Sequence, residues 1–167
     1  MSLNPITVQS FSNEFQAAVE DLVLPIQKEE FGFEITRDEQ TELIDIAGVF
    51  QKGKGNFWIA LDGEKLIGTI GVIDIANGQV ALKKMFVHRD YRRRGVAQSL
   101  MNMTIQWCKE KGVKQIFLAT NSKMIAAQAF YETNGFNELP KRDLPDAFPI
   151  ASVASKFYLR NLYIERI

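Results

Sequence analysis

The feature that most constrains this chain is a change of hydrophobic period near its middle. Apolar, β-branched runs there alternate with tight-turn pairs, in the order Phe57–Leu61, Asp62-Gly63, Leu66–Ile75, Asn77-Gly78 and Val80–Val87. Runs joined by such pairs are typical of antiparallel hairpins. From Gly95 to Lys111 the apolar residues recur at helical spacing instead. The sequence therefore predicts a three-stranded antiparallel meander followed directly by a helix.

Further elements are expected on both sides of this meander. They are a strand at Ile6–Val8, a helix from Ser12 to Ile26, a helix from Asp38 to Phe50, a strand at Ile116–Ala119, a helix over 123–133, a loop over 140–155 and a closing strand at Lys156–Tyr163. The expected order is β-α-α-β-β-β-α-β-α-β-β, in which one of the last two strands is not assigned a range. A strand, helix and strand in succession favour a parallel pair, here Val80–Val87 with Ile116–Ala119. We predict one α/β domain over residues 1–167, with a mixed central sheet flanked by helices.

Composition excludes several classes of protein. The chain has 167 residues, 46% of them hydrophobic and 24% charged, as in a globular domain. It contains no run of 18 apolar residues, so we expect no association with a membrane. One histidine, His88, and one cysteine, Cys108, cannot build a structural zinc site or a disulfide framework. We therefore expect a cytoplasmic protein without a metal.

Charge is balanced overall but not along the chain. Lys plus Arg and Asp plus Glu number 20 each. Ten acidic residues and two basic ones lie between Glu14 and Asp45, whereas six basic residues and one acidic residue lie between Lys83 and Arg94. Zero net charge argues against a nucleic-acid partner, which requires a long basic stripe. The short basic cluster suits a small phosphorylated ligand better.

The most informative stretch joins the end of a strand at Val87 to the start of a helix at Gly95. A helix start presents N–H groups without intrahelical partners and carries partial positive charge. Gly95 allows close approach of an anion, and neighbouring arginines add full charge. No Gly-Lys-Ser/Thr follows, and no Gly-x-Gly-x-x-Gly is present, so neither an ATP-binding P-loop nor a dinucleotide fingerprint fits.

Two motifs in this arrangement resemble those of a known superfamily. Arg92-Arg93-Arg94-Gly95-Val96-Ala97 matches the pattern Q/R-x-x-G-x-G/A. Phe130-Tyr131-Glu132-Thr133-Asn134-Gly135-Phe136 is similar to a block written Tyr-Glu-x-x-Gly-Phe, and it follows about 40 residues later. Both are typical of the GNAT superfamily of N-acetyltransferases. The expected order of elements resembles the GNAT fold over nearly the whole chain.

This resemblance implies a site and a reaction. Acetyl-CoA would be the acyl donor, with its pyrophosphate held at Arg92, Arg93, Arg94, Gly95, Val96 and Ala97 and its pantetheine along the main chain of Met85, Phe86 and Val87. Tyr131 would be the general acid that protonates the departing thiolate. Many members have an Asn seven residues before this Tyr. This chain has Met124 there, and Asn121 is the nearest candidate for that cofactor contact.

The sequence does not determine which group deprotonates the acceptor. Members often carry a Glu near the position of Ala81, which cannot accept a proton. A water chain, another acid such as Asp74 or Glu30, or an acceptor that is already partly neutral would each serve.

The acceptor would be a small-molecule or peptide primary amine, attacked directly in a ternary complex. Because the family's acceptor site lies near the first two helices, the acidic residues there lead to the hypothesis of a cationic acceptor, with Glu30, Glu34 and Asp74 as binding residues. A homodimer through Lys156–Tyr163 is an arrangement that the resemblance allows. Two alternatives have other functions. One is a non-catalytic acyl-CoA-binding module of the same fold, and the other is a nucleic-acid binder that uses the 83–94 cluster.

Overall fold

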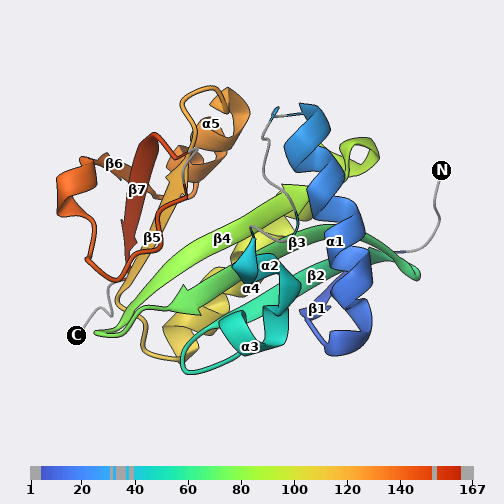
Figure 1. Cartoon of the computed structure of the whole chain (residues 1–167), viewed down its shortest axis with the longest axis horizontal. Coiled ribbons are helices and arrows are strands. Elements are labelled where there is room, and N and C mark those ends of the chain that lie inside the picture. The colour runs from blue at the N-terminus through green and yellow to red at the C-terminus, as the bar shows by residue number, and fades with distance from the viewer. Residues whose placement is uncertain (1–4, 31, 33–36, 38–39, 152–153, 163–167) are drawn as a thin grey trace.

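The computed structural model describes residues 5–30, 32, 37, 40–151 and 154–162. Within these residues, one sheet has the strand order β1-β2-β3-β4-β5-β7-β6 (Figure 1). Its strands are β1 Ile6–Ser10, β2 Asn56–Asp62, β3 Lys65–Asp74, β4 Gln79–Val87, β5 Gln115–Thr120, β6 Asn137–Leu139 and β7 Lys156–Asn161. The predicted meander is confirmed as β2, β3 and β4, which pair antiparallel. The parallel pair is confirmed as β4 with β5.

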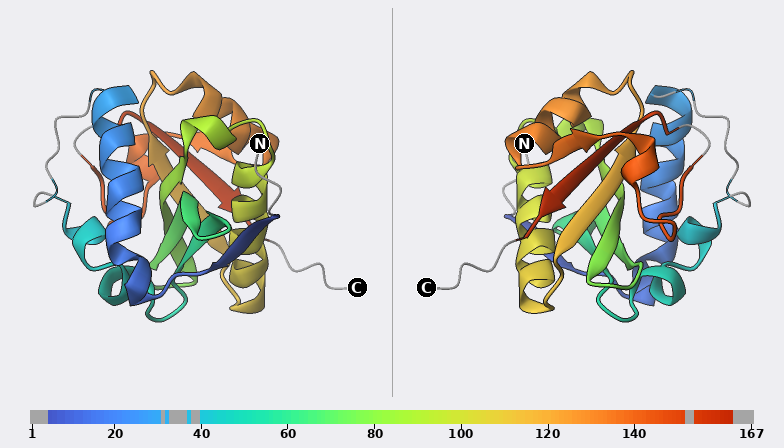
Figure 2. Two further views of the ribbon diagram at one scale, coloured as in Figure 1. Left: turned by 90° about the vertical axis from the view of Figure 1, so that its right-hand side faces the viewer. Right: turned by 90° about the vertical axis from the view of Figure 1, so that its left-hand side faces the viewer.

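Helices cover both faces of this sheet (Figure 2). The α-helices are α1 Gln16–Pro25, α2 Thr41–Ile44, α3 Ile46–Phe50, α4 Val96–Glu110 and α5 Ile125–Thr133. Successive strand residues face opposite sides, so in β2 Phe57 packs with the α1–α3 core and Trp58 with the α4 core. Short helical turns occupy Asn13–Phe15, Ile26–Glu30, Arg89–Tyr91 and Lys141–Asp143.

The second predicted helix is interrupted. It is divided into α2 and α3 at Asp45, which has φ −142° and ψ 72°. The Asp45 carboxylate accepts a hydrogen bond from the Gly48 amide at 3.1 Å, so it caps α3 rather than continuing α2. The predicted start at Asp38 lies outside the described residues.

The pairing of β4 with β5 is short, and this positions the candidate site. The register joins Gln79–Leu82 to Gln115–Leu118 and then stops, although β4 continues to Val87 and β5 to Thr120. Beyond the pairing, the two strands part (Figure 1). Main-chain groups of β4 on this side lose their sheet partners, and such groups require a ligand, a side chain or water.

The closing strand ends earlier than predicted and is not at the edge of the sheet. β7 covers Lys156–Asn161, and Tyr163 lies outside the described residues. Residues Phe157–Leu159 pair with β5 on one side and with β6 on the other. A second copy would have to displace β6 before pairing there.

Candidate functional site

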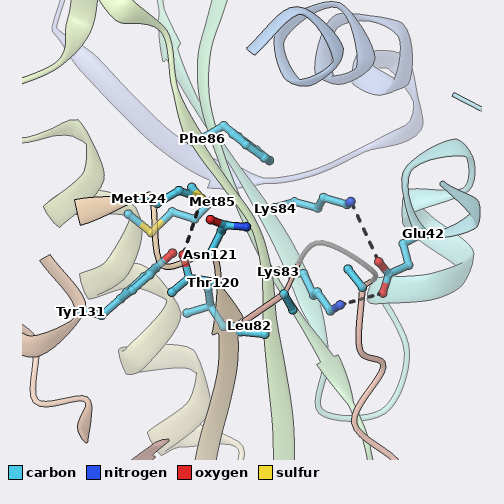
Figure 3. Close-up of a pocket in the computed structure, with 13 residues that line it drawn as sticks. Glu42, Leu82, Lys83, Lys84, Met85, Phe86, Thr120, Asn121, Met124 and Tyr131 are labelled. Atoms are coloured by element: carbon cyan, nitrogen blue, oxygen red, sulfur yellow. Dashed lines mark hydrogen bonds and ion pairs between the residues drawn. The ribbon is translucent and has the colours of Figure 1, made fainter. Parts of the chain in front are cut away.

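A cavity of about 140 Å³ lies where β4 and β5 separate (Figure 3). Residues of both strands, α2, α5 and the segment before β7 line it, namely Glu42, Leu82, Lys83, Lys84, Met85, Phe86, Ala119, Thr120, Asn121, Met124, Tyr131, Ala151 and Ala154. The predicted residues Met85, Phe86, Asn121 and Tyr131 therefore lie together. Figure 3 shows Tyr131 on one side of the cavity and two lysines, directed toward Glu42, on the other.

A second cavity, of about 520 Å³, lies at the start of α4. Met85 lines both cavities, so the two spaces adjoin. The second one is lined by Met85, Val87, Tyr91, Arg92, Arg93, Gly95, Val96, Ala97, Gln98, Ala126, Ala127 and Phe130. The structure thus connects the predicted anion-binding loop to the gap between the strands.

The backbone of this loop is shaped to hold an anion. Gly95 precedes α4 with φ 80°, and Arg93 has φ 63°. Apart from its neighbours in the chain, no described residue has an atom within 4 Å of where a Cβ on Gly95 would be, so an oxyanion can approach the backbone there. Alternating left-handed residues turn successive N–H groups inward, and the first turn of α4 adds amides without helical acceptors. These features fit the pyrophosphate of CoA.

The three arginines differ in their surroundings. Arg92 and Arg93 line the second cavity. The Arg92 Nε donates to the Val87 carbonyl at 3.0 Å, which joins the loop to the end of β4. The Arg94 guanidinium instead lies 5.2 Å from the centre of the Tyr91 ring and does not line the cavity.

Tyr131 is held by aromatic packing. It lies on α5 and is 8% exposed, with the Tyr158 ring 6.2 Å and the Phe136 ring 5.9 Å away. Burial raises the pKa of the Tyr131 phenol to about 12. The hydroxyl therefore keeps its proton at neutral pH, as a donor to a leaving thiolate must.

Asn121 and Met124 form the turn between β5 and α5. The Met124 amide donates to the Asn121 carbonyl at 2.9 Å, and the Asn121 Oδ1 accepts from the Lys123 amide at 2.9 Å. Both side chains line the first cavity. Asn121 shapes this turn as well as facing the site.

Lys83, Lys84 and Glu42 are site residues that the sequence did not reveal. Neighbouring strand residues normally face opposite sides of a sheet. A bulge in β4 opposite Thr69–Gly71, with Lys84 at φ 56°, turns both lysines into the same cavity. The buried Thr69 hydroxyl donates to the Lys84 carbonyl at 2.7 Å and holds the bulge.

Ala81, where many members have a Glu, has a structural role in this chain. It is fully buried and packs with Ile75, Phe117 and Phe148. Phe148 comes from the predicted loop 140–155, which folds back onto the sheet and contributes Ala151 and Ala154 to the first cavity. A carboxylate at position 81 would be buried among apolar groups.

Of the three acidic acceptor candidates, Asp74 is the one whose side chain the structure describes, and it does not line the first cavity. Asp74 lies at the end of β3, where its carboxylate accepts from the Lys54 amide at 2.9 Å and the Ala76 amide at 2.7 Å. Glu30 ends the turn Ile26–Glu30, but its side chain is outside the described residues, as is all of Glu34. Glu42, from the same acidic stretch, is the carboxylate that lines this cavity among the residues described.

We expect the Asp74 carboxylate to stabilise the folded chain. Hydrogen bonds from the Lys54 and Ala76 amides lower the pKa of the Asp74 carboxyl. Its stabilisation is therefore fully present above the unfolded pKa, about 3.9, and is lost as the pH falls through the folded value. At pH 7, Asp74→Ala should lower the free energy of unfolding by roughly 1–2 kcal/mol, as the loss of hydrogen bonds to a charged group does. Denaturant melts at several pH values measure this, and a change confined to the acceptor KM would contradict it.

Neither a metal-binding cluster nor a membrane-spanning helix is found in the described part of the chain. No cluster of three or more His, Cys, Asp or Glu side chains is arranged to hold a metal ion. None of the helices in that part combines the length and apolar character needed to cross a membrane.

The family follows from comparison with known proteins. The model of the acetyltransferase (GNAT) family matches residues 20–136, and the chain belongs to this family. Human N-acetyltransferase 8 is 27% identical over 104 residues, which cover 59% of this chain and 46% of that protein. Streptothricin acetyltransferase A of Bacillus subtilis (strain 168) is 29% identical over 119 residues, covering 71% and 68%. The chain spans about half the length of the mammalian relatives that it matches.

Solved structures agree with this placement. A GNAT-family acetyltransferase from Staphylococcus aureus Mu50 has a TM-score of 0.92 and 38% identity, covering 95% of this chain and 100% of that one. An N-acetyltransferase from Thermoplasma acidophilum, in complex with coenzyme A, has a TM-score of 0.73 at 14% identity, covering 95% and 99%. The second likeness shows the fold alone. The chain has a mixed α/β fold of the GNAT type.

Proposed function

We propose that the chain transfers an acetyl group from acetyl-CoA directly to a primary amine. The observation that carries this proposal is the adjoining pair of cavities, one at an anion-binding helix start and one between parted strands. Acetyl-CoA, when bound, would supply the activated thioester. The amides of Arg93–Ala97, with Arg92 beside them, would hold its pyrophosphate, and Met85, Phe86 and Val87 would line its path into the gap between the strands.

Tyr131 and Glu42, on opposite sides of the cavity, would each transfer one proton. The Tyr131 phenol, protonated because of its burial, would donate to the leaving sulfur. Glu42 would receive the proton of the amine. Its Oε2 makes no hydrogen bond among the described residues and is paired only at 3.6 Å with the Lys83 ammonium. No covalent acetyl-enzyme is needed, and burial raises the pKa of the Cys108 thiol to about 12, which makes it a poor nucleophile.

Release of CoA thiol in the presence of single amines tests this proposal. The wild-type chain should consume acetyl-CoA faster with at least one class of amine than without amine. Acetyl-CoA binding without transfer to any amine would favour the non-catalytic acyl-CoA-binding module instead.

The variant Glu42→Gln tests the assignment of the base. A general base contributes about 100- to 10,000-fold, so kcat should fall by that order while the acetyl-CoA Kd stays unchanged. The loss should shrink at high pH, where the acceptor amine deprotonates in solution. An exposed acid on α4, Glu110, provides the control Glu110→Gln. If kcat keeps its wild-type value in Glu42→Gln, a water chain or another group accepts the proton.

A further inference from the structure

Lys83 and Lys84 are largely buried cations that share one counter-ion, Glu42, in the described structure. Their side chains are 13% and 12% exposed. Each Nζ makes its short hydrogen bond to a neutral oxygen, Lys83 to the Pro149 carbonyl at 2.7 Å and Lys84 to the Gln40 Oε1 at 3.0 Å. The Glu42 oxygens lie farther away, 3.6 Å from Lys83 and 4.0 Å from Lys84.

Such an arrangement leaves charge uncompensated. Close hydrogen bonds between ammonium and carboxylate groups are about 2.7–2.9 Å long, so Glu42 forms only long ion pairs with the two lysines, at 3.6 and 4.0 Å. Two positive charges and one negative charge line the cavity among the described residues. Burial lowers the pKa of both lysines, and Glu42 offsets this only in part. Burying an unpaired charge is costly, and an anionic ligand would repay that cost.

Both lysines are also fixed in position. The Gln40 amide that accepts from Lys84 donates in turn to the buried Gln27 Oε1 at 2.7 Å. Lys83 lies 5.5 Å from the centre of the Phe148 ring. Each ammonium has three donors, and one short bond to a protein oxygen leaves donors that can turn to a ligand in the cavity.

The spacing of the charges indicates a compact ligand. Each lysine ammonium lies within 4.0 Å of the Glu42 carboxylate, on the side of the cavity opposite Tyr131 (Figure 3). An amino acid carries its amine and its carboxylate on one carbon. Its carboxylate can meet the lysines while its nitrogen meets Glu42.

We propose that the acceptor is a small amine that also carries an oxyanion, as an amino acid does, and that Lys83 and Lys84 bind this oxyanion. This inference rests on the proposed function and names the substrate class of the same site. It differs from the cationic acceptor that the acidic stretch suggests. The reacting nitrogen would lie beside Glu42, and the oxyanion would neutralise the excess positive charge.

Initial rates of CoA release on a matched panel of amines test this inference. The panel pairs each standard amino acid with its amide, pairs O-phosphoethanolamine with ethanolamine, and includes spermidine as a cationic amine. We expect kcat/KM to be about 10- to 100-fold higher for oxyanion-bearing acceptors, as one or two hydrogen bonds to charged groups would give. The amino-acid and phosphoethanolamine arms distinguish a carboxylate from a phosphate. Equal or faster turnover of amides or spermidine would overturn the inference and leave the proposed function standing.

Substitution of Lys83 and Lys84 tests whether these residues cause the preference for oxyanion-bearing acceptors. Lys83→Met and Lys84→Met should each lower the ratio of kcat/KM between amino acid and amide by about tenfold, mainly through the acceptor KM, with the acetyl-CoA KM unchanged. Lys109→Met, at an exposed position of α4, should keep the wild-type ratio. A ratio unchanged in both cavity variants would contradict the assignment to these lysines.

Calorimetric titration keeps the test independent of turnover. The same amino acids and amides are titrated into wild-type chain saturated with CoA. Oxyanion-dependent binding that is lost in Lys83→Met supports the inference even if no amine is acetylated, in which case the proposed transfer is what fails. Absence of binding by every oxyanion-bearing amine, together with absence of turnover, overturns both.

Discussion

Replacing Tyr131 with Phe should lower kcat by about 100- to 10,000-fold, the range of a lost general acid, while the acetyl-CoA Kd stays within about twofold. The phenol is buried in the first cavity and keeps its proton because its pKa is raised to about 12. The substitution removes only the hydroxyl, so the leaving thiolate loses its donor and the ring packing remains. Steady-state rates with a saturating acceptor and calorimetry with acetyl-CoA measure the two quantities.

Tyr158 provides a matched control for this variant. It is a buried tyrosine on β7, with its ring 6.2 Å from that of Tyr131 and its hydroxyl bonded to Glu132 at 3.3 Å. Tyr158→Phe also removes a buried hydroxyl, yet it should keep kcat within about threefold because this hydroxyl is outside the cavity. Equal losses in the two variants would indicate disturbed packing instead of a missing acid.

Replacing Gly95 with Glu should weaken acetyl-CoA binding by at least about 100-fold. The residue has φ 80°, so any side chain is strained there. A carboxylate would also extend into the space where the loop is open to an anion, and like charges in contact cost several kcal/mol. Titration calorimetry on the folded variant measures the Kd.

The other end of the same helix provides the control. Gly112 follows α4 with φ 75°, and the part of the chain that the structure describes likewise places no atom within 4 Å of its Cβ position, its chain neighbours aside. Gly112→Glu carries a similar backbone strain at a distance from both cavities, so it should lower stability and keep the Kd. Wild-type affinity in Gly95→Glu would place the pyrophosphate elsewhere.

The sequence predicted the parts of this fold that follow local rules. The pairs Asp62-Gly63 and Asn77-Gly78 determined the hairpins, and the change to helical spacing after Gly95 located α4. The break at Asp45 was missed although Asp is a common helix cap. The helical spacing of apolar residues continues through Asp45, so the sequence predicted one unbroken helix there.

The sequence singled out many of the residues that line the two cavities, but not the two lysines and Glu42 that lie opposite Tyr131. Gly95 and Tyr131 lie within contiguous motifs that fix their place. Lys83 and Lys84 reach one cavity only because of a bulge at Lys84, and nothing in an alternating strand pattern indicates where an extra residue falls. Lys83 and Lys84, two members of the basic cluster, are therefore largely buried and do not form part of a basic surface. Counting acids along the chain could not show that Glu42 alone, among the described residues of that stretch, lines the cavity.

Thermal melting of CoA-free chain with and without acetyl-CoA tests the central claim most directly, namely that the helix start and the parted strands together hold this donor. At a concentration 100 times Kd, a ligand specific for the folded state adds about 2.7 kcal/mol, which corresponds to roughly 5–11 °C in Tm for a chain of this size. We predict a rise of that order for wild type and at most about 1–2 °C for Gly95→Glu, because its Kd should be at least about 100-fold higher. An unchanged Tm in wild type at millimolar acetyl-CoA would contradict the account.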